Sequence, residues 1–322
     1  MKNQIYFAKS KSDKTRFEST SGGIFFELAK YIINCGGCVA GATFDKNLKL
    51  KHFLVNSLDE LHLIQKSKYV ESKAYNVYIE IKQKLDDEKL VLFSGTPCQV
   101  SALKSYLRKD YKNLITMDFI CRGVNSNKAF NSWIKEIESK NKSNVDNVWF
   151  KYKIGGWKSS PMRTRVDFSN GTYKVYEGFD NLYMYGYLFQ NLYLRPCCTK
   201  CRFKGSDRSS DVTVGDFWGL QKELDDDKGT SFVMLNTEKG EQIFASIEKN
   251  IISGFAENST FASNPMFSSN VERSIKSNKF LALLDNYKFS KALKIVDAFP
   301  KKNRILKFLV KIKKGILRNG KK

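Results

Sequence analysis

The sequence predicts an α/β fold of mixed α+β character, with a parallel strand-helix-strand core, a mixed sheet, an antiparallel hairpin region and a helical C-terminus. A compact apolar run at 89–93, a helix-periodic segment at 99–107 and a second apolar run at 114–120 predict the core. Asn170-Gly171 lies between two alternating runs, a pattern typical of a hairpin. Beyond about residue 265 the pattern is mostly helical and basic.

The N-terminal segments also show clear periodicity. Apolar residues recur at helical spacing in 24–34, between Ser21-Gly22-Gly23 and Gly36-Gly37, so a helix is expected there. The following segments are expected to form a strand at 38–44, a strand at 52–55 and a helix at 72–85.

Two cysteines follow the strands of the predicted core. Cys98 comes after the first strand in the turn SGTPC, and Cys121 stops the second strand. A strand-helix-strand unit has a right-handed crossover and parallel strands, so both residues fall in loops at the same sheet edge. Neighbouring strands lie about 4.8 Å apart, so the two thiols can approach each other.

The length of 322 residues predicts more than one structural unit. We expect an N-terminal domain on the cofactor side at 1–86, a second domain with the cysteines at 87–265, and a helical basic tail at 266–322. No apolar run of spanning length and no secretory signal is visible, which predicts a cytoplasmic protein.

The net charge of +22 is unevenly distributed. Residues 301–322 hold ten Lys or Arg and no acidic residue, and the rest of the excess is spread along the chain. This distribution suits an anionic partner such as a phosphorylated cofactor, an acidic electron carrier or a membrane surface. No nucleic-acid-binding motif is present, so no nucleic-acid partner is expected.

The basic tail has an amphipathic pattern. One helical face of 301–322 carries Ile305, Phe308, Leu309, Ile312 and Ile316. Such a helix can lie on the inner membrane surface as a peripheral contact, or it can pack on the protein itself.

Four cysteines form a candidate metal site. Cys198 and Cys201 supply a CxxC pair, and Cys98 and Cys121 can complete a four-thiolate set. From spacing alone an iron–sulfur cluster, a structural zinc ion and no metal remain open. The surrounding cations favour the thiolate form. They are Arg195, Lys200, Arg202 and Lys204.

The remaining three cysteines are expected to lie outside this site. Cys35 and Cys38 form a second CxxC, which we interpret as structural because no further pair completes it. Cys197 adjoins a proposed ligand, and its side chain should point elsewhere.

Six segments, in order, resemble the beta-subunit family of coenzyme F420 hydrogenases and dehydrogenases. They are SGG at 21–23, SKYVESK at 67–73, LVLFSGTPCQVSALKSYL at 90–107, DFICRGVNS at 118–126, RPCCTKCRFKGSDRSSDVTVGDFWG at 195–219 and DKGTSFVMLNTEKG at 227–240. Chlorophyll-modifying reductases look like relatives of that family. Two departures are that Cys197 stands where serine is more usual, and that no ferredoxin-type repeat of CxxC turns precedes the first segment.

The resemblance implies an iron–sulfur flavoprotein oxidoreductase. Members carry FAD and a [4Fe–4S] cluster, and matching positions assign the cluster to Cys98, Cys121, Cys198 and Cys201. One cluster implies a separate electron carrier such as a ferredoxin. The acceptor would be a deazaflavin or another small molecule, and polysaccharide biosynthesis is one setting in which bacterial members occur.

Eleven further residues are candidates for binding the cofactor. Ser21, Gly22 and Gly23 offer N–H donors at a helix N-terminus, although an ordinary helix cap explains them equally well. The other candidates are Ser67, Lys68, Tyr69, Gly95, Thr96, Pro97, Arg122 and Asp216. With only two histidines, histidine-based acid/base catalysis is not expected, and the catalytic residues stay unassigned.

Two other classes of function remain open from the sequence. The same four cysteines could hold a structural zinc ion in a non-catalytic scaffold or binding protein. The charge of the chain also fits an accessory protein at a membrane surface.

Overall fold

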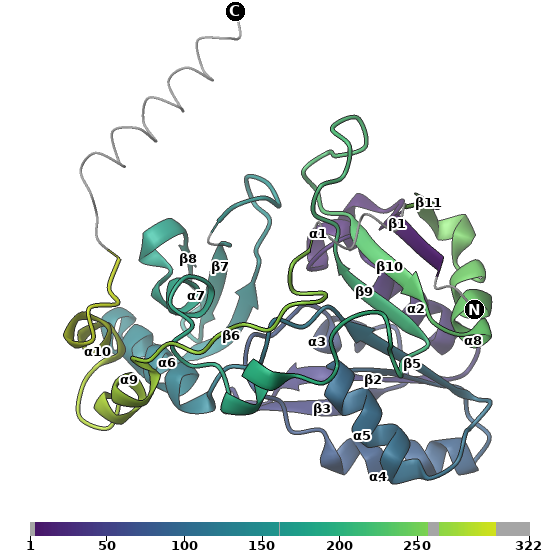
Figure 1. The fold of residues 1–322 in the computed structure, drawn as a ribbon, viewed down its shortest axis with the longest axis horizontal. Helices are drawn as coiled ribbons and strands as arrows, with labels where there is room; N and C mark the ends of the chain where they lie inside the picture. The colour runs from purple at the N-terminus through teal and green to yellow at the C-terminus, as the bar shows by residue number, and fades with distance from the viewer. Residues whose placement is uncertain (1–3, 161, 257–263, 301–322) are drawn as a thin grey trace, which may run out of the picture.

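The computed structural model describes residues 4–160, 162–256 and 264–300. It contains an eight-stranded sheet and a three-stranded sheet, which lie on opposite sides of the molecule with helices packed around them (Figure 1). The amphipathic helix expected in 301–322 lies outside the described residues.

The large sheet has a parallel centre and antiparallel edges, in the order β11-β1-β10-β9-β5-β4-β2-β3. Its strands are β1 (Gln4–Ser10), β2 (Cys38–Phe44), β3 (Leu50–Val55), β4 (Val91–Ser94), β5 (Leu114–Phe119), β9 (Val212–Asp216), β10 (Ser231–Leu235) and β11 (Ile251–Phe255). β2, β4, β5 and β9 pair in parallel, and the remaining pairs are antiparallel. Strands from both sides of residue 86 thus share one sheet.

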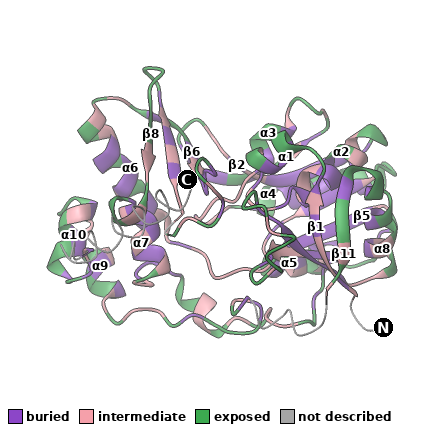
Figure 2. Ribbon diagram, turned by 90° about the horizontal axis from the view of Figure 1, so that it is seen from above, coloured by how far each residue is buried: buried purple, intermediate pink, exposed green. Residues whose placement is uncertain are grey.

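Helices cover both faces of this sheet. α5 (Pro97–Leu107) joins the parallel strands β4 and β5, which confirms the predicted strand-helix-strand core. Leu92 packs with α2 (Ile24–Asn34), whereas its neighbours Val91 and Phe93 pack with α4 (Tyr75–Asp86) and α5. Successive strand residues face opposite sides, so β4 is buried on both faces. The neighbouring strand β2 is also largely buried (Figure 2).

The small sheet confirms the predicted hairpin. It consists of β6 (Val145–Phe150), β7 (Thr164–Phe168) and β8 (Tyr173–Tyr176) in antiparallel pairs. Gly171, with φ of 79°, makes the turn between β7 and β8. An aromatic-rich core joins this sheet to the surrounding helices. Those helices are α6 (Asn127–Asn141), α7 (Leu182–Leu188), α9 (Ser277–Leu283) and α10 (Phe289–Ile295).

Several elements were not predicted from the sequence. They are the strands β1, β9 and β11, the helices α1 (Asp13–Glu18), α3 (Leu61–Ile64), α6 and α8 (Glu238–Ala245), and the 3₁₀ turns η1 (Gly178–Asp180), η2 (Pro196–Lys200) and η3 (Glu248–Asn250). β9 contains threonine, glycine and aspartate, and long-range pairing with β5 and β10 stabilises it as a strand. Local pattern alone does not report such pairing.

Helix α5 begins earlier than the sequence pattern indicated. Thr96 and Gln99 form a capping box, and Pro97 occupies the first turn. Both features favour a helix start at this point. Cys98 therefore lies in the first turn of α5, and its expected position in a loop was wrong.

None of the helices in the described ranges combines the length and the apolar character that a membrane span requires.

Candidate functional site

A cleft of about 570 Å³ opens where β4 and β5 end, and we call it the central cleft. Parallel sheets commonly bind ligands at this edge, because the loops after the strands converge there. Eleven predicted site residues line it. They are Ser21, Gly23, Ser67, Lys68, Tyr69, Gly95, Thr96, Cys98, Cys121, Arg122 and Asp216. Gly22, Pro97, Cys198 and Cys201 do not belong to its lining.

The Ser21-Gly22-Gly23 turn is tightly held by β10 and leads into α2. The Ser21 hydroxyl donates to Thr230 O at 2.8 Å, and Gly22 N–H donates to the Ser231 hydroxyl at 2.9 Å. A Cβ at Gly22 would lie 2.4 Å from Ala8 O, so no larger residue fits. Gly23 supplies no side-chain cap, so the first N–H groups of α2 lack an intrahelical partner at the cleft.

Lys68 is partly buried, and its ammonium holds its own loop together. Its ammonium donates to Ala42 O at 2.6 Å, to Leu63 O at 3.2 Å and to Gln65 O. An ammonium has three donors, so none remains for a ligand. Burial lowers the pKa of Lys68 to about 7, and the nearby charge of Lys66 contributes to this shift.

Ser67 and Tyr69 flank Lys68 in different surroundings. Ser67 N–H donates to the Thr20 hydroxyl at 2.7 Å, which joins this loop to the segment before α2. The Tyr69 ring contacts the Tyr187 ring at 5.6 Å, and burial raises the pKa of Tyr69 well above its usual value.

The turn between β4 and α5 presents Cys98 to the cleft. Its sulfur lies 3.0 Å from the Thr96 hydroxyl. A Cβ at Gly95 would lie 2.9 Å from the Phe93 ring, so glycine is required for this close turn. Pro97 is buried at the start of the helix and serves the turn itself.

Arg122 and Asp216 are both engaged by protein groups. Arg122 donates to Tyr187 O at 3.1 Å, to Leu188 O at 3.0 Å and to Asn191 Oδ1 at 2.7 Å. Asp216 forms an ion pair with Lys151, which is 4% exposed and stands over the Trp157 ring. Arg122 therefore orders the loop after β5, and Asp216 keeps a partly exposed carboxylate at the cleft.

Cys121 and Cys198 come from segments that lie in direct contact at Gly123. A Cβ at Gly123 would lie 3.2 Å from Cys198 Cβ and 2.8 Å from Leu194 Cδ2. Val124 N–H donates to the Cys198 sulfur at 3.4 Å. Burial raises the pKa of the Cys121 thiol to about 12, and Gly123 N–H opposes this shift.

Lys204 connects the segment after Cys201 to the loop of Cys121. Its ammonium donates to Cys121 O at 2.7 Å and to Met266 O at 2.8 Å. Burial lowers the pKa of Lys204, whereas Cys121, Cys201 and Cys198 raise it, so the cation lies within electrostatic range of all three thiols.

The four predicted ligands thus lie on neighbouring segments, but their side chains do not meet at one point. Across the described ranges, no three His, Cys, Asp or Glu side chains are close enough together to hold a metal ion. Val124 N–H donates to a cysteine sulfur, and the Lys204 ammonium lies near the thiols. Hydrogen bonds and charges of this kind tune clusters that are bound by thiolates. The surroundings fit a cluster, and the assignment of the four ligands stays a prediction.

The other cysteines differ in exposure. Cys35 and Cys197 are exposed, and Cys38 is buried. Burial raises the pKa of Cys38 to about 11, which fits a packed thiol in β2.

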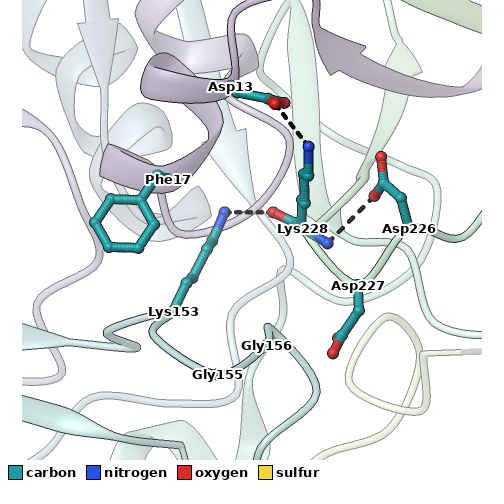
Figure 3. Close-up of a pocket in the computed structure, with 8 residues that line it drawn as sticks. All are labelled: Asp13, Phe17, Lys153, Gly155, Gly156, Asp226, Asp227 and Lys228. Carbon is teal, nitrogen blue, oxygen red and sulfur yellow. Dashed lines mark hydrogen bonds and ion pairs between the residues drawn. The ribbon is translucent and has the colours of Figure 1, made fainter. Parts of the chain in front are cut away.

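A second cavity, of about 440 Å³, lies beside α1 (Figure 3). Lys153 donates there to Arg16 O, to Ser21 O at 2.6 Å and to Lys228 O at 2.9 Å. Lys228 pairs in turn with Asp13 at 2.6 Å. The cations of this cavity are therefore engaged by protein groups, and Lys153 supports the Ser21 turn from behind.

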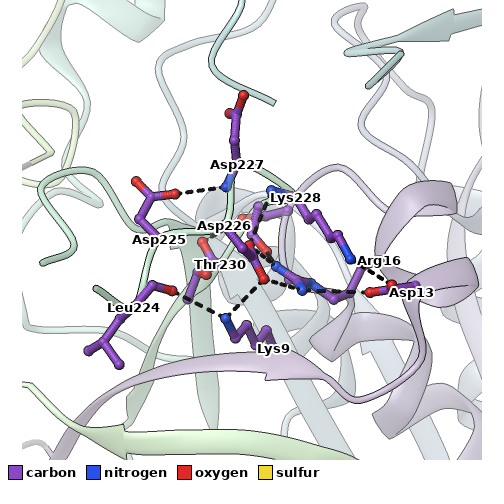
Figure 4. Close-up of polar contacts among 12 residues, drawn as sticks. Lys9, Asp13, Arg16, Leu224, Asp225, Asp226, Asp227, Lys228 and Thr230 are labelled. Carbon is purple, nitrogen blue, oxygen red and sulfur yellow. Dashed lines mark hydrogen bonds and ion pairs between the residues drawn. The ribbon is translucent and has the colours of Figure 1, made fainter. Parts of the chain in front are cut away.

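The loop at 225–229 is fixed by a carboxylate shared between two cations (Figure 4). Asp226 accepts from Arg16 at 2.7 and 2.6 Å and from Lys9 at 3.1 Å. The Arg16 guanidinium holds the pKa of Asp226 far below its usual range. This loop overlaps the start of the DKGTSF segment at 227–240, which contacts the Ser21 turn through Thr230.

His52 and Lys66 are among the residues that line the cleft and were missed in the sequence. His52 is 6% exposed, and its Nε2 lies 3.1 Å from Ser94 O. Lys66 lies over the Trp149 ring at 4.1 Å and has a φ of 71°. Their positions depend on the pairing of β3 with β2 and on a strained loop, and neither leaves a local sequence signal.

Comparisons with known proteins extend this picture. The family model for the C terminus of the coenzyme F420 hydrogenase/dehydrogenase beta subunit matches residues 88–258, more than half of the chain. No curated protein matches the chain. A chain of the xenon-derivatised F420-reducing [NiFe] hydrogenase complex from Methanosarcina barkeri is similar in fold, with a TM-score of 0.52 over 91% of both chains and 16% sequence identity.

Proposed function

Because the chain belongs to the coenzyme F420 hydrogenase/dehydrogenase beta-subunit family, we propose that it is an iron–sulfur flavoprotein oxidoreductase. In this proposal Cys98, Cys121, Cys198 and Cys201 hold a [4Fe–4S] cluster, and the central cleft binds FAD. The observation that carries it is the shared position of Cys98 and Cys121 in the wall of a cleft large enough for a cofactor.

The local environment of the cysteines supports the cluster. A [4Fe–4S] core bound to four thiolates needs N–H donors at sulfur and nearby positive charge to set its potential. Val124 N–H and the Lys204 ammonium are placed to supply them. A zinc ion would use the same ligands, and metal analysis distinguishes the two.

The protein's own residues would position the flavin and limit access of water. Bound flavin supplies hydride and one-electron chemistry, which is the cofactor's own contribution. Gly95 lets the backbone come close to the cleft, Tyr69 forms an aromatic wall, and Asp216 offers a carboxylate oxygen to a ligand hydroxyl. Arg122 holds the Cys121 loop in place by its three hydrogen bonds.

Electrons would arrive from a separate carrier, such as a ferredoxin, and leave to a deazaflavin or another small acceptor. The structural neighbour comes from a multi-subunit hydrogenase complex, which supports a protein partner. Polysaccharide biosynthesis is a proposed setting, and contact of 301–322 with a membrane surface is proposed from its charge alone.

Comparing two cysteine variants tests the proposal. We expect anaerobically purified wild-type protein to be brown, to lose its broad visible absorbance on reduction with dithionite, and to release FAD on denaturation. Cys198→Ser should lose most of the cluster absorbance, whereas Cys35→Ser, at an exposed position, should keep it. A colourless, folded wild-type protein, or equal loss in both variants, would refute the proposal.

A further inference from the structure

Two side chains in the wall of the central cleft carry buried polar atoms that have no hydrogen-bond partner among the described residues. These atoms are His52 Nδ1 and Gln65 Nε2. His52 is 6% exposed and Gln65 is 3% exposed. Buried polar groups in folded proteins are almost always hydrogen-bonded, because an unpaired group has lost its contacts with water. Two such groups in one cleft indicate a ligand that completes them.

The His52 imidazole is fixed so that its unpaired nitrogen is an acceptor. Nε2 lies 3.1 Å from Ser94 O, and a carbonyl oxygen can only accept, so Nε2 carries the hydrogen. Burial lowers the pKa of His52 to about 4, so the ring is neutral near pH 7 and Nδ1 keeps a lone pair. The Phe93 ring stacks on the imidazole at 5.3 Å, which limits its rotation. Nδ1 therefore requires a donor from the ligand.

Gln65 supplies the opposite polarity. Its Nε2 carries two N–H donors, and no acceptor for them lies within the described part of the chain. The backbone of Gln65 is held in place, because its N–H donates to Leu61 O at 3.1 Å and its carbonyl oxygen accepts from the Lys68 ammonium. The amide thus belongs to a fixed loop, and its nitrogen requires an acceptor from the ligand.

Lys68 connects the surroundings of these two residues. Its ammonium donates to Gln65 O and also to Ala42 O, and Ala42 of β2 is the register partner of His52 in β3. The charge of Lys68 contributes to the lowered pKa of His52, so the two side chains lie within electrostatic range. Ala42, Lys68 and Ser94 all line the central cleft. The groups around both residues therefore belong to the wall of the same cleft.

From these unpaired atoms, we propose that His52 and Gln65 are specificity-determining residues that recognise a ring edge with an N–H group and a carbonyl oxygen. His52 Nδ1 accepts from the N–H group, and Gln65 Nε2 donates to the carbonyl oxygen. The pyrimidine ring of a flavin has such an edge, made of its N3–H group and the carbonyl groups on either side. The inference rests on the proposed flavin site and names the part of the flavin that these two side chains select.

Binding of FAD and of 3-methyl-FAD by protein stripped of its flavin tests this inference. In 3-methyl-FAD a methyl group replaces the hydrogen on N3, and the rest of the ligand is identical. Wild-type protein should bind FAD roughly 10-fold more tightly or better, measured by fluorescence titration, because methylation removes a hydrogen bond to a buried acceptor. His52→Ala should bind the two ligands about equally, since it removes the acceptor and opens space for the methyl group.

Gln65→Met tests the second contact. It should weaken the binding of both ligands by about 10-fold and keep the preference for FAD, because both ligands carry the carbonyl oxygen. The matched controls are His62→Ala and Gln83→Met at exposed positions, which should leave both affinities unchanged. Circular dichroism checks the fold of each variant.

The outcomes separate this inference from the flavin site itself. If wild-type protein binds FAD and 3-methyl-FAD equally, or if His52→Ala keeps the wild-type preference, the inference is wrong and the flavin site stands. Unchanged affinity in Gln65→Met would contradict the role of Gln65. If wild-type protein binds neither ligand, the flavin site and this inference both fall.

Discussion

Gly123 is a residue at which the Cys121 loop packs closely against the Cys198 segment. Its φ of 133° is rarely adopted by residues with a side chain, and an added Cβ would collide with Leu194 at 2.8 Å. The same Cβ would lie 3.2 Å from Cys198 Cβ, so the two segments would have to separate. A single methyl group thus tests whether their contact matters for metal binding.

We expect Gly123→Ala to lower the iron content per chain by at least about half while the fold persists, because clusters require converging thiolates. Iron is measured after anaerobic purification, and circular dichroism checks the fold. Gly171→Ala is the matched control, since Gly171 also has positive φ but no atom within 4 Å of its added Cβ. Equal iron content in the two variants would argue against the proposed contact.

His52 gives the protein a defined sensitivity to acid. Burial lowers its pKa from 6.5 to about 4, while the bond to Ser94 O opposes the shift. Between about pH 6.5 and pH 4, His52 is therefore protonated in the unfolded chain but stays neutral in the folded chain. The free energy of unfolding should therefore fall by about 2 kcal/mol between pH 6.5 and about pH 5. It should go on falling until about pH 4.

His52→Gln should remove this part of the pH dependence, because glutamine does not titrate and its amide can still donate to Ser94 O. Urea unfolding at several pH values measures the difference between the two proteins. Parallel pH profiles for wild type and variant would show that His52 is not the responsible group.

At the scale of elements, the sequence predicts β4, α5, β5 and the β7–β8 hairpin, because each is encoded by local periodicity or by Asn-Gly. β1 and β9 were not predicted because their positions depend on long-range pairing. Gln4 of β1 pairs with Leu235, and Val212 of β9 pairs with Met117. The residues that line the cleft also divide into those that a local motif predicts and those that only tertiary contacts place there. Gly95 and Cys98 lie in a motif, whereas Lys66 and His52 are brought in by tertiary contacts.

Asp211 joins three elements in the interior. Its carboxylate accepts from Thr116 N–H and the Thr116 hydroxyl of β5, both at 2.7 Å, and from the Thr237 hydroxyl before α8 at 2.8 Å. Asp211→Ala should destabilise the protein by about 3 kcal/mol, because the buried donors would lose a charged acceptor. Asp146→Ala, at an exposed site, should change stability by less than about 0.5 kcal/mol. Urea unfolding measures the free energy of unfolding of both variants. A similar loss in the two variants would contradict this role of Asp211.

At the scale of the whole molecule, one sheet collects strands from both ends of the described chain and places the loops after β4 and β5 at one edge. The segment that carries Cys198 and Cys201 contacts this edge through Gly123 and Lys204. The fold thereby places three distant stretches of sequence that carry these cysteines side by side. We propose that the cysteines hold an iron–sulfur cluster next to the central cleft.

Quantifying iron, zinc and acid-labile sulfide in one anaerobically purified sample tests this claim most directly. The account predicts about four iron and four sulfide ions per chain, with negligible zinc. About one zinc ion per chain without iron or sulfide would contradict it and would favour a structural zinc site built from the same cysteines.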